Sequence, residues 1–228
     1  TPAVIHFAYL GSINNIIDID GIVNFLEITG KMTPVFLHVV GDGENRGLFE
    51  EKLKSKGIKA EFYGAVYEEA VKAEIFSRCM FGINMMKPGV CVGLTMKSID
   101  YFCYGLPLVN NIPGDTWELV KQEQIGINYR PDAALKCAQE LLALAQSGRI
   151  KAIKYKMQSL YMKLFTQEAA EIVIRERVFP LLEEARNNEY PSYIPLFPVH
   201  KSQPRRRCVY GKGDRNITKM ASGICAYL

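Results

Sequence analysis

Residues 81–110 read FGINMMKPGVCVGLTMKSIDYFCYGLPLVN. A short apolar run over Phe81–Met85 leads into a glycine-containing loop, which is followed by an amphipathic segment over Thr95–Tyr104 and a second apolar run over Leu106–Asn110. Two apolar strands joined through a helix form a βαβ unit, in which the strands run parallel. This stretch therefore predicts a parallel sheet with at least one covering helix.

The same alternation extends over the first 130 residues. Nearly continuous apolar runs such as VFLHVV at 35–40 are typical of strands that are buried on both faces. The expected strands are Val4–Leu10, Val35–Val40, Ala60–Tyr63, Phe81–Met85, Leu106–Asn110 and Ile125–Asn128. The expected helices between them are Asp18–Thr29, Glu44–Lys56, Glu68–Ser77, Thr95–Tyr104 and Thr116–Gln122. This order predicts an α/β fold, a Rossmann-like doubly wound parallel sheet with right-handed crossovers.

After Asp132 the pattern becomes helical only. Three further helices are expected, over Asp132–Gln146, Ile150–Phe165 and Gln167–Asn187. They would pack on the sheet or extend toward a neighbouring domain. We therefore expect one Rossmann-like domain with C-terminal helices over residues 1–190.

Composition excludes several classes of protein. The chain has 228 residues, of which 48% are hydrophobic and 23% charged, close to the average for soluble globular proteins. No apolar run reaches the roughly 18 residues of a membrane span. The six cysteines form no CxxC pair and have no zinc-like spacing, so we expect a reduced, cytosolic chain without a metal site.

The basic residues are unevenly distributed. Residues 191–228 hold seven of the 28 basic residues but one of the 24 acidic residues. Several prolines and an RRR cluster give this segment no periodicity, which predicts an extended or disordered basic tail. The tail is either without function or contacts anionic lipid or nucleic acid. Residues 1–190 have no excess of basic over acidic residues, so we do not expect this part of the chain to bind nucleic acid.

Ligands of open parallel sheets bind at the loops that follow the carboxyl ends of the strands. The first such loop, GSINN at 11–15, offers Gly11 for close backbone approach and Ser12 for hydrogen bonding. The second, GDGEN at 41–45, lacks a complete GxGxxG because residue 46 is Arg46. We therefore expect a structural turn there rather than a dinucleotide site, with Asp42 available to cap the next helix.

The third loop, YGAVY at 63–67, allows two interpretations. Gly64 leaves room beside the backbone, where a nucleobase would find hydrogen-bonding groups, whereas Tyr63 and Val66 would equally suit core packing. In the fifth loop, after Asn110, Asp115 or Thr116 is expected to cap a helix.

The fourth loop carries the clearest signal. Gly93 precedes a helix that starts near Thr95, and a helix N-terminus favours a phosphate. Lys97 lies in the first turn, where a cation opposes the helix dipole and calls for an anion nearby. Asp100, one turn later, would accept hydrogen bonds from ribose hydroxyls. The alternative is a solvated Lys97–Asp100 ion pair.

These motifs, taken in order, resemble a known family. Residues 97–108, KSIDYFCYGLPL, are similar to the pattern K-x-x-E-Y-x-x-x-G-x-P-(V/I) of the C-terminal, donor-binding domain of GT-B fold glycosyltransferases of the retaining, group 1 type. Supporting segments occur in the same order: YLGSI, HVVGDG, FYGAV, FGINMM, WELV and IGINY. The resemblance covers residues 3–130.

The resemblance implies transfer of a sugar, of the hexosyl type, from a nucleotide diphosphate sugar to a hydroxyl acceptor, with neither a metal nor another cofactor. Lys97 and Asp100 would be the catalytic residues, holding the diphosphate and the ribose. The further donor-binding residues would be Gly11, Ser12, Tyr63, Gly64, Val66, Val92, Gly93, Leu94 and Thr95. The implied setting is bacterial polysaccharide or glycolipid synthesis, in the cytoplasm, with peripheral contact at the inner face of the membrane.

Several positions depart from the family pattern. Val92 stands where the family usually has a glutamate, and Asp100 is one methylene shorter than the usual ribose-binding acid. Ser12 and Asp20 stand where basic residues commonly contact the diphosphate. The acceptor-binding half precedes the donor half in such enzymes, so we expect a fragment or split subunit. The acceptor glycan or glycolipid would then bind through a missing N-terminal domain or partner subunit, without which transfer is weak or absent.

Three other functions stay open. The departures at Ser12 and Val92 favour a catalytically silent nucleotide-sugar binding or scaffolding module. A sugar-nucleotide 2-epimerase shares this architecture, although its acid and base residues are not found here. Nucleic-acid binding through the tail is the third alternative.

Overall fold

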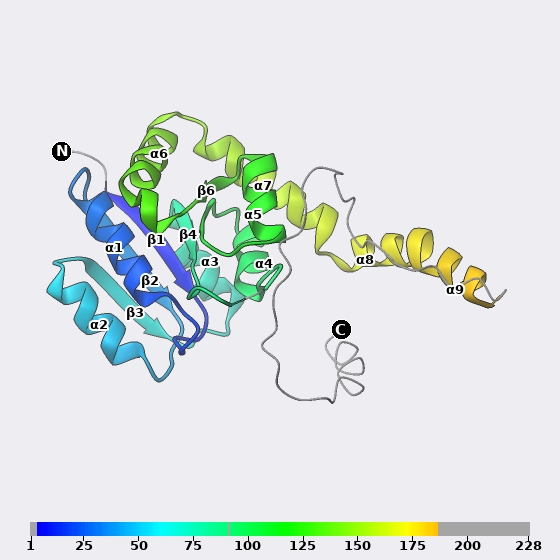
Figure 1. Cartoon of the computed structure of the whole chain (residues 1–228), viewed down its shortest axis with the longest axis horizontal. Helices are drawn as coiled ribbons and strands as arrows, with labels where there is room; N and C mark the ends of the chain where they lie inside the picture. Colours follow the sequence, from blue (N-terminus) through cyan, green and yellow to red (C-terminus); the bar gives the residue numbers. More distant parts are fainter. Residues whose placement is uncertain (1–3, 91, 187–228) are drawn as a thin grey trace. The chain divides into compact units, whose positions relative to one another are not determined.

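The computed structural model describes residues 4–90 and 92–186. Six strands form one sheet: β1 (Ile5–Leu10), β2 (Val35–Val40), β3 (Lys59–Gly64), β4 (Phe81–Asn84), β5 (Leu108–Asn110) and β6 (Gly126–Asn128). They pair in parallel in the order β3-β2-β1-β4-β5-β6 (Figure 1). This order confirms the expected doubly wound, Rossmann-like fold, and it reverses direction between β1 and β4.

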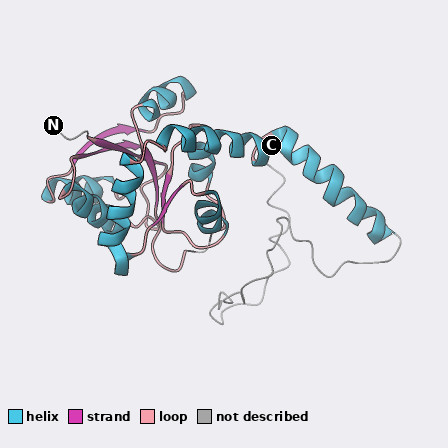
Figure 2. Cartoon of the chain, turned by 90° about the horizontal axis from the view of Figure 1, so that it is seen from above, coloured by secondary structure: helices cyan, strands magenta, loops and turns pink. Residues whose placement is uncertain are grey.

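Helices cover both faces of the sheet, as Figure 2 shows. The helices are α1 (Ile19–Gly30), α2 (Arg46–Ser55), α3 (Glu69–Ser77), α4 (Met96–Cys103), α5 (Asp115–Glu123), α6 (Ala134–Gln146), α7 (Ile150–Leu164), α8 (Gln167–Val173) and α9 (Phe179–Arg186). Buried side chains of α1, α2 and α6 join Phe7 and Tyr9 in one core cluster. Those of α3, α4, α5 and α7 join Ala8 and Leu10 in the other.

The two clusters follow from the alternation of side chains along a strand. Odd-numbered residues of β1 face one helix layer and even-numbered residues face the other. Because both faces are covered, nearly every residue of β1 is buried, which explains why these strands read as continuous apolar runs.

The C-terminal helices differ in detail from the expected ones. Pro131–Ala133 form a 3-10 turn, and α6 begins at Ala134 rather than at Asp132. Proline is accepted in the first turn of a helix, and it favours an extended conformation in the residue before it, here Arg130. A π-helical turn at Ile174–Val178 separates α8 from α9. No helix within the described part of the chain is long and apolar enough to cross a membrane. The basic tail predicted for 191–228 lies outside the described residues.

Candidate functional site

The strands β1 and β4 part at the reversal of the sheet, and Tyr101 of α4 lies between them. Their pairing ends at Tyr9 and Ile83. The Tyr101 hydroxyl accepts a hydrogen bond from Leu10 N–H (2.8 Å) and is 3.1 Å from the Ile83 carbonyl, to which it donates. A Cβ at Gly82 would lie 2.8 Å from the Tyr101 ring, so the ring can lie on β4 only because residue 82 is glycine. Tyr101 thus fixes α4 against the end of the sheet.

The N-terminus of α4 is anchored by a chain of buried amides. Thr95 caps the helix, accepting from Ser98 N–H, and its hydroxyl donates to Asn84 Oδ1 at 3.0 Å. Asn84, Asn110 and Asn128 are aligned across β4, β5 and β6. Asn84 Nδ2 donates to Asn110 Oδ1 (2.9 Å), and Asn110 Nδ2 donates to Asn128 Oδ1 (3.1 Å). This asparagine ladder joins the carboxyl ends of three strands to the helix that carries Lys97.

The loop before α4 is tied to α5. The Gly93 carbonyl accepts from both Thr116 N–H and Thr116 Oγ1, each at 2.9 Å. The expectation that Asp115 or Thr116 caps α5 is wrong, because Gly114 holds the cap position and Thr116 is already within the helix. A Cβ at Gly93 would lie 2.7 Å from Asp115 Oδ2, so glycine permits this close approach. Val92 and Leu94, on either side of it, are half-buried.

Lys97 departs from ordinary lysine behaviour. A surface lysine usually keeps its ammonium in water and buries its stem. Here Nζ is buried without a hydrogen-bond partner among the described residues, and it lies 5.0 Å from the centre of the Tyr9 ring. Burial lowers the pKa of Lys97 to about 8. A buried ammonium with free donors is costly, and a ligand anion would satisfy it.

The carboxyl group of Asp100 interacts with charged residues of α3. Its carboxyl group is half-buried and close to Glu69 and Lys72 of α3. Burial raises the pKa of Asp100, Lys72 opposes this rise, and Glu69 adds to it. No ion pair joins Lys97 to Asp100 in the described part of the chain, so the alternative of a solvated Lys97–Asp100 pair is wrong. The two side chains lie on one helix, but the structure does not bring their charged groups together.

The first two loops pack backbone against backbone. Gly11 has a φ of +114°, and Ser12 beside it is exposed, with its carbonyl accepting from the Tyr9 hydroxyl at 2.8 Å. A Cβ at Gly41 would lie 2.0 Å from the Gly11 carbonyl oxygen, which explains the glycine that opens GDGEN. The expected structural turn is confirmed. Asp42 does not cap α2, because Asn45 holds that position.

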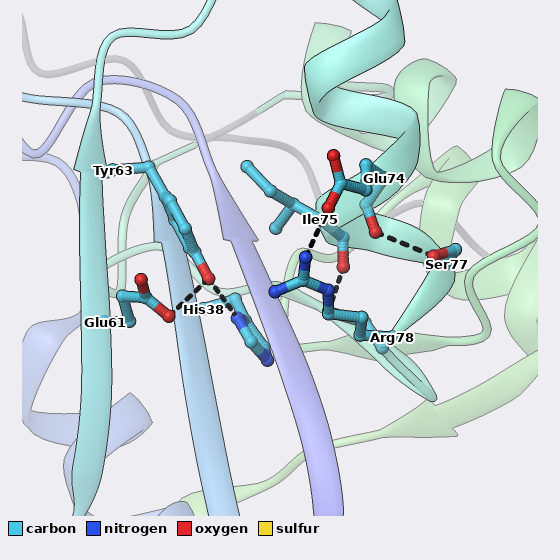
Figure 3. A network of polar contacts seen from close by, with 8 residues as sticks. His38, Glu61, Tyr63, Glu74, Ile75, Ser77 and Arg78 are labelled. Atoms are coloured by element: carbon cyan, nitrogen blue, oxygen red, sulfur yellow. Dashed lines mark hydrogen bonds and ion pairs between the residues drawn. The ribbon is translucent and has the colours of Figure 1, made fainter.

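The third loop gives a mixed result. Gly64 has a φ of +70° and its carbonyl accepts from Gly41 N–H, so it lies beside the second loop. The Tyr63 hydroxyl instead donates to Glu61 and contacts His38 Nδ1 (Figure 3). Val66 packs on the core cluster that contains Ala8 and Leu10. Tyr63 and Val66 thus take the packing role that was the alternative for them, and a Cβ at Gly64 would meet nothing within 4 Å.

At the reversal of the sheet, the structure links Lys97 to Tyr9 and Tyr9 to Ser12, and it ties Thr95 to the end of β4. Gly93 is tied instead to α5. Reasoning from sequence missed Tyr9, Tyr101 and the asparagine ladder. Each asparagine ends an apolar run (FGIN, PLVN and IGIN), and this repetition is the signal that would have found the ladder. Within residues 4–90 and 92–186, no three His, Cys, Asp or Glu side chains lie close enough to hold a metal ion.

Comparison with known proteins supports the fold. No family model matches the sequence. No curated protein matches it either. Among solved structures, the catalytic domain of cholesterol-α-glucosyltransferase from Helicobacter pylori is 16% identical, with a TM-score of 0.55, and the match covers 72% of this chain and 99% of that one. Anabaena HepE with UDP-glucose is 16% identical, with a TM-score of 0.57, over 74% of this chain and 48% of that one.

The pneumococcal O-GlcNAc transferase GtfA, solved with UDP and GlcNAc, is a third match. It is 17% identical, with a TM-score of 0.57, over 72% of this chain and 34% of that one. The chain thus spans about a third to a half of the length of GtfA and HepE. At these identities the likeness shows the fold alone, a Rossmann-like parallel α/β sheet that these glycosyltransferases also contain.

Proposed function

We propose that this chain is the donor-binding half of a retaining, group 1 type GT-B glycosyltransferase. It would transfer a sugar from a nucleotide diphosphate sugar to a hydroxyl acceptor. The observation that carries this proposal is the buried Lys97 ammonium, which lacks a partner among the described residues and lies in the first turn of α4. The α4 N-terminus lies at the reversal of the sheet, where open α/β folds bind their ligands.

The donor would bind across α4. Lys97 and the backbone of residues 93–95 would hold the diphosphate, with the dipole of α4 adding to the attraction. The Lys97 ammonium is buried, so its flexible side chain would have to turn outward to reach a phosphate oxygen. Asp100 would accept from the ribose hydroxyls, and the backbone around Gly64 would contact the base.

The chemistry needs charge stabilisation more than a nucleophile. As the glycosidic bond to the diphosphate breaks, negative charge develops on the leaving phosphate, and fixed donors stabilise it better than water does. Lys97 and the α4 N-terminus supply such donors without a metal. The acceptor would be positioned by a second domain or a partner subunit, so this half alone would bind the donor and transfer hexose slowly.

The proposed setting is bacterial polysaccharide or glycolipid synthesis at the cytoplasmic face of the membrane. The Helicobacter cholesterol glucosyltransferase supports the glycolipid part of this setting, and the neighbour solved with UDP-glucose supports a nucleotide-sugar donor. A catalytically silent donor-binding module is the second candidate. Val92, in place of the usual glutamate, favours this candidate because a half-buried valine offers the sugar no hydrogen bond.

Binding measurements on the full chain test the site. UDP, GDP, ADP, dTDP and their common sugars would be screened by thermal shift, since ligand at 100 times its Kd adds about 2.7 kcal/mol of stability. We expect Lys97→Met to weaken both the nucleotide and inorganic pyrophosphate at least tenfold, and Asp100→Asn to weaken the nucleotide alone. Lys87→Met is the matched control, because Lys87 is an exposed lysine of the same loop.

The pH dependence provides a second readout. The Lys97 ammonium loses its proton above a pKa of about 8, whereas the diphosphate stays fully ionised there. Affinity should therefore fall up to tenfold per pH unit above pH 8, and Lys97→Arg should remove this fall. Absence of binding by every nucleotide, or equal binding by Lys97→Met, would contradict the proposed site. Transfer by the chain once an acceptor domain is supplied would exclude the silent module.

A further inference from the structure

Tyr9 contacts Lys97 from the opposite side of the sheet. The Tyr9 side chain belongs to the core cluster of α1, α2 and α6, whereas α4 packs on the other face. The Lys97 ammonium nevertheless lies 5.0 Å from the centre of the Tyr9 ring. The lysine side chain must therefore pass the carboxyl end of β1 to reach the ring. This path places a positive charge at the edge where the first and fourth loops meet.

The Tyr9 ring is held rigidly. It is fully buried, and its edge-to-face contact with Phe49 has a centroid distance of 5.9 Å. Its hydroxyl donates to the Ser12 carbonyl at 2.8 Å. Burial raises the pKa of Tyr9, so the hydroxyl remains a neutral donor. The ring thus offers Lys97 a fixed surface, and it also anchors the loop that carries Gly11 and Ser12.

The Tyr9 ring attracts the Lys97 ammonium but accepts no ordinary hydrogen bond from it. A cation over an aromatic face is attracted by the ring quadrupole, and the attraction strengthens when water is excluded. The face accepts none of the three N–H donors in a normal hydrogen bond, so they stay available to phosphate oxygens. Without the ring, the flexible lysine would turn to water and would have to be ordered and dehydrated again on binding.

We infer that Tyr9 is a positioning residue for the donor diphosphate, acting through Lys97, whose ammonium its ring holds at the end of β1. This inference rests on the proposed function, because it assigns a role to Tyr9 only if Lys97 binds the diphosphate. The ring carries the effect and is held by its burial and by Phe49, whereas the hydroxyl makes a separate contact with the Ser12 carbonyl.

The test is a titration of the full chain with inorganic pyrophosphate. Tyr9→Leu removes the ring, Tyr9→Phe keeps it, and Phe7→Leu removes an equally buried ring from the same strand and the same cluster. We expect Tyr9→Leu to weaken pyrophosphate about tenfold, whereas Tyr9→Phe and Phe7→Leu stay within about threefold of the unaltered chain. Circular dichroism would confirm that all three variants are folded.

The other outcomes contradict the inference in distinguishable ways. Unchanged affinity in Tyr9→Leu would show that Lys97 needs no ring. Equal losses in Tyr9→Leu and Phe7→Leu would show a general loosening of the core, and an equal loss in Tyr9→Phe would assign the effect to the hydroxyl. If Lys97→Met binds pyrophosphate as well as the unaltered chain does, the proposed function fails and the inference fails with it.

Discussion

At the scale of single residues, His38 shows how burial determines a protonation state. The residue is 3% exposed, and His6 Nδ1 lies 2.9 Å from its Nε2. The Tyr63 oxygen lies 2.8 Å from its Nδ1 (Figure 3). Because Tyr63 gives its own proton to Glu61, its oxygen can accept one from His38 Nδ1. One consistent arrangement of protons is then His6 to His38, His38 to Tyr63 and Tyr63 to Glu61, with His38 neutral.

Stability should consequently depend on the protonation of His38. Burial lowers the pKa of His38 from 6.5 to about 4, with nearby His6 and Arg78 adding to the shift and Glu61 opposing it. The unfolded chain then binds more protons than the folded chain between these values, so stability is full above pH 6.5 and falls as the pH drops toward 4. We expect a loss of about 2 kcal/mol between pH 7 and pH 5.

Urea unfolding at several pH values would measure this loss. Carboxylates titrate mostly below this window, so His38→Gln should abolish most of the slope between pH 7 and pH 5. A variant with the same slope as the unaltered chain would show that another group is responsible.

At the scale of elements, one buried hydroxyl group contributes to holding α4 against the sheet. The Tyr101 hydroxyl takes the place of a strand neighbour for Leu10, whose N–H would otherwise lie buried without an acceptor where β1 and β4 part. Its ring lies on Gly82, and Phe102 beside it packs into the same core cluster. The helix that carries Lys97 and Asp100 is thus attached through a polar contact at the centre of the sheet.

Tyr101→Phe should therefore destabilise the chain out of proportion to the single atom it removes. We expect the free energy of unfolding to fall by about 1–3 kcal/mol, because Leu10 N–H is left buried and unpaired. Tyr104→Phe, three residues later, removes a hydroxyl that bonds to Glu69 nearer the surface, and it should cost about 1 kcal/mol or less. Urea unfolding would measure the free energy of unfolding of both variants. Equal losses would show that the hydrogen bond to Leu10 N–H stabilises the chain no more than the one to Glu69 does.

At the scale of the whole molecule, the order of strands and helices was predictable because its signals are local. Apolar runs such as VFLHVV, and the glycines and prolines between them, place all six strands to within a few residues. The placement of Lys97 in a first helical turn was also local. The burial of Lys97 against Tyr9 could not be predicted from local sequence. The same holds for the contact of Tyr101 with Ala8, which joins residues 93 positions apart. Contacts of this length depend on the assembled sheet, so a pattern in one stretch of sequence does not show them.

The folding unit should end before α8. Both core clusters, including their half-buried members, lie within residues 5–165, and Ala169 alone is buried among residues 166–183. Removing residues 166–186 should thus take little apolar surface out of the core. We expect a chain that ends at Phe165 to match one that ends at Arg186 within about 1 kcal/mol in free energy of unfolding. Comparing these two shortened chains by urea unfolding isolates α8 and α9, and a loss of several kcal/mol would show that these helices belong to the core.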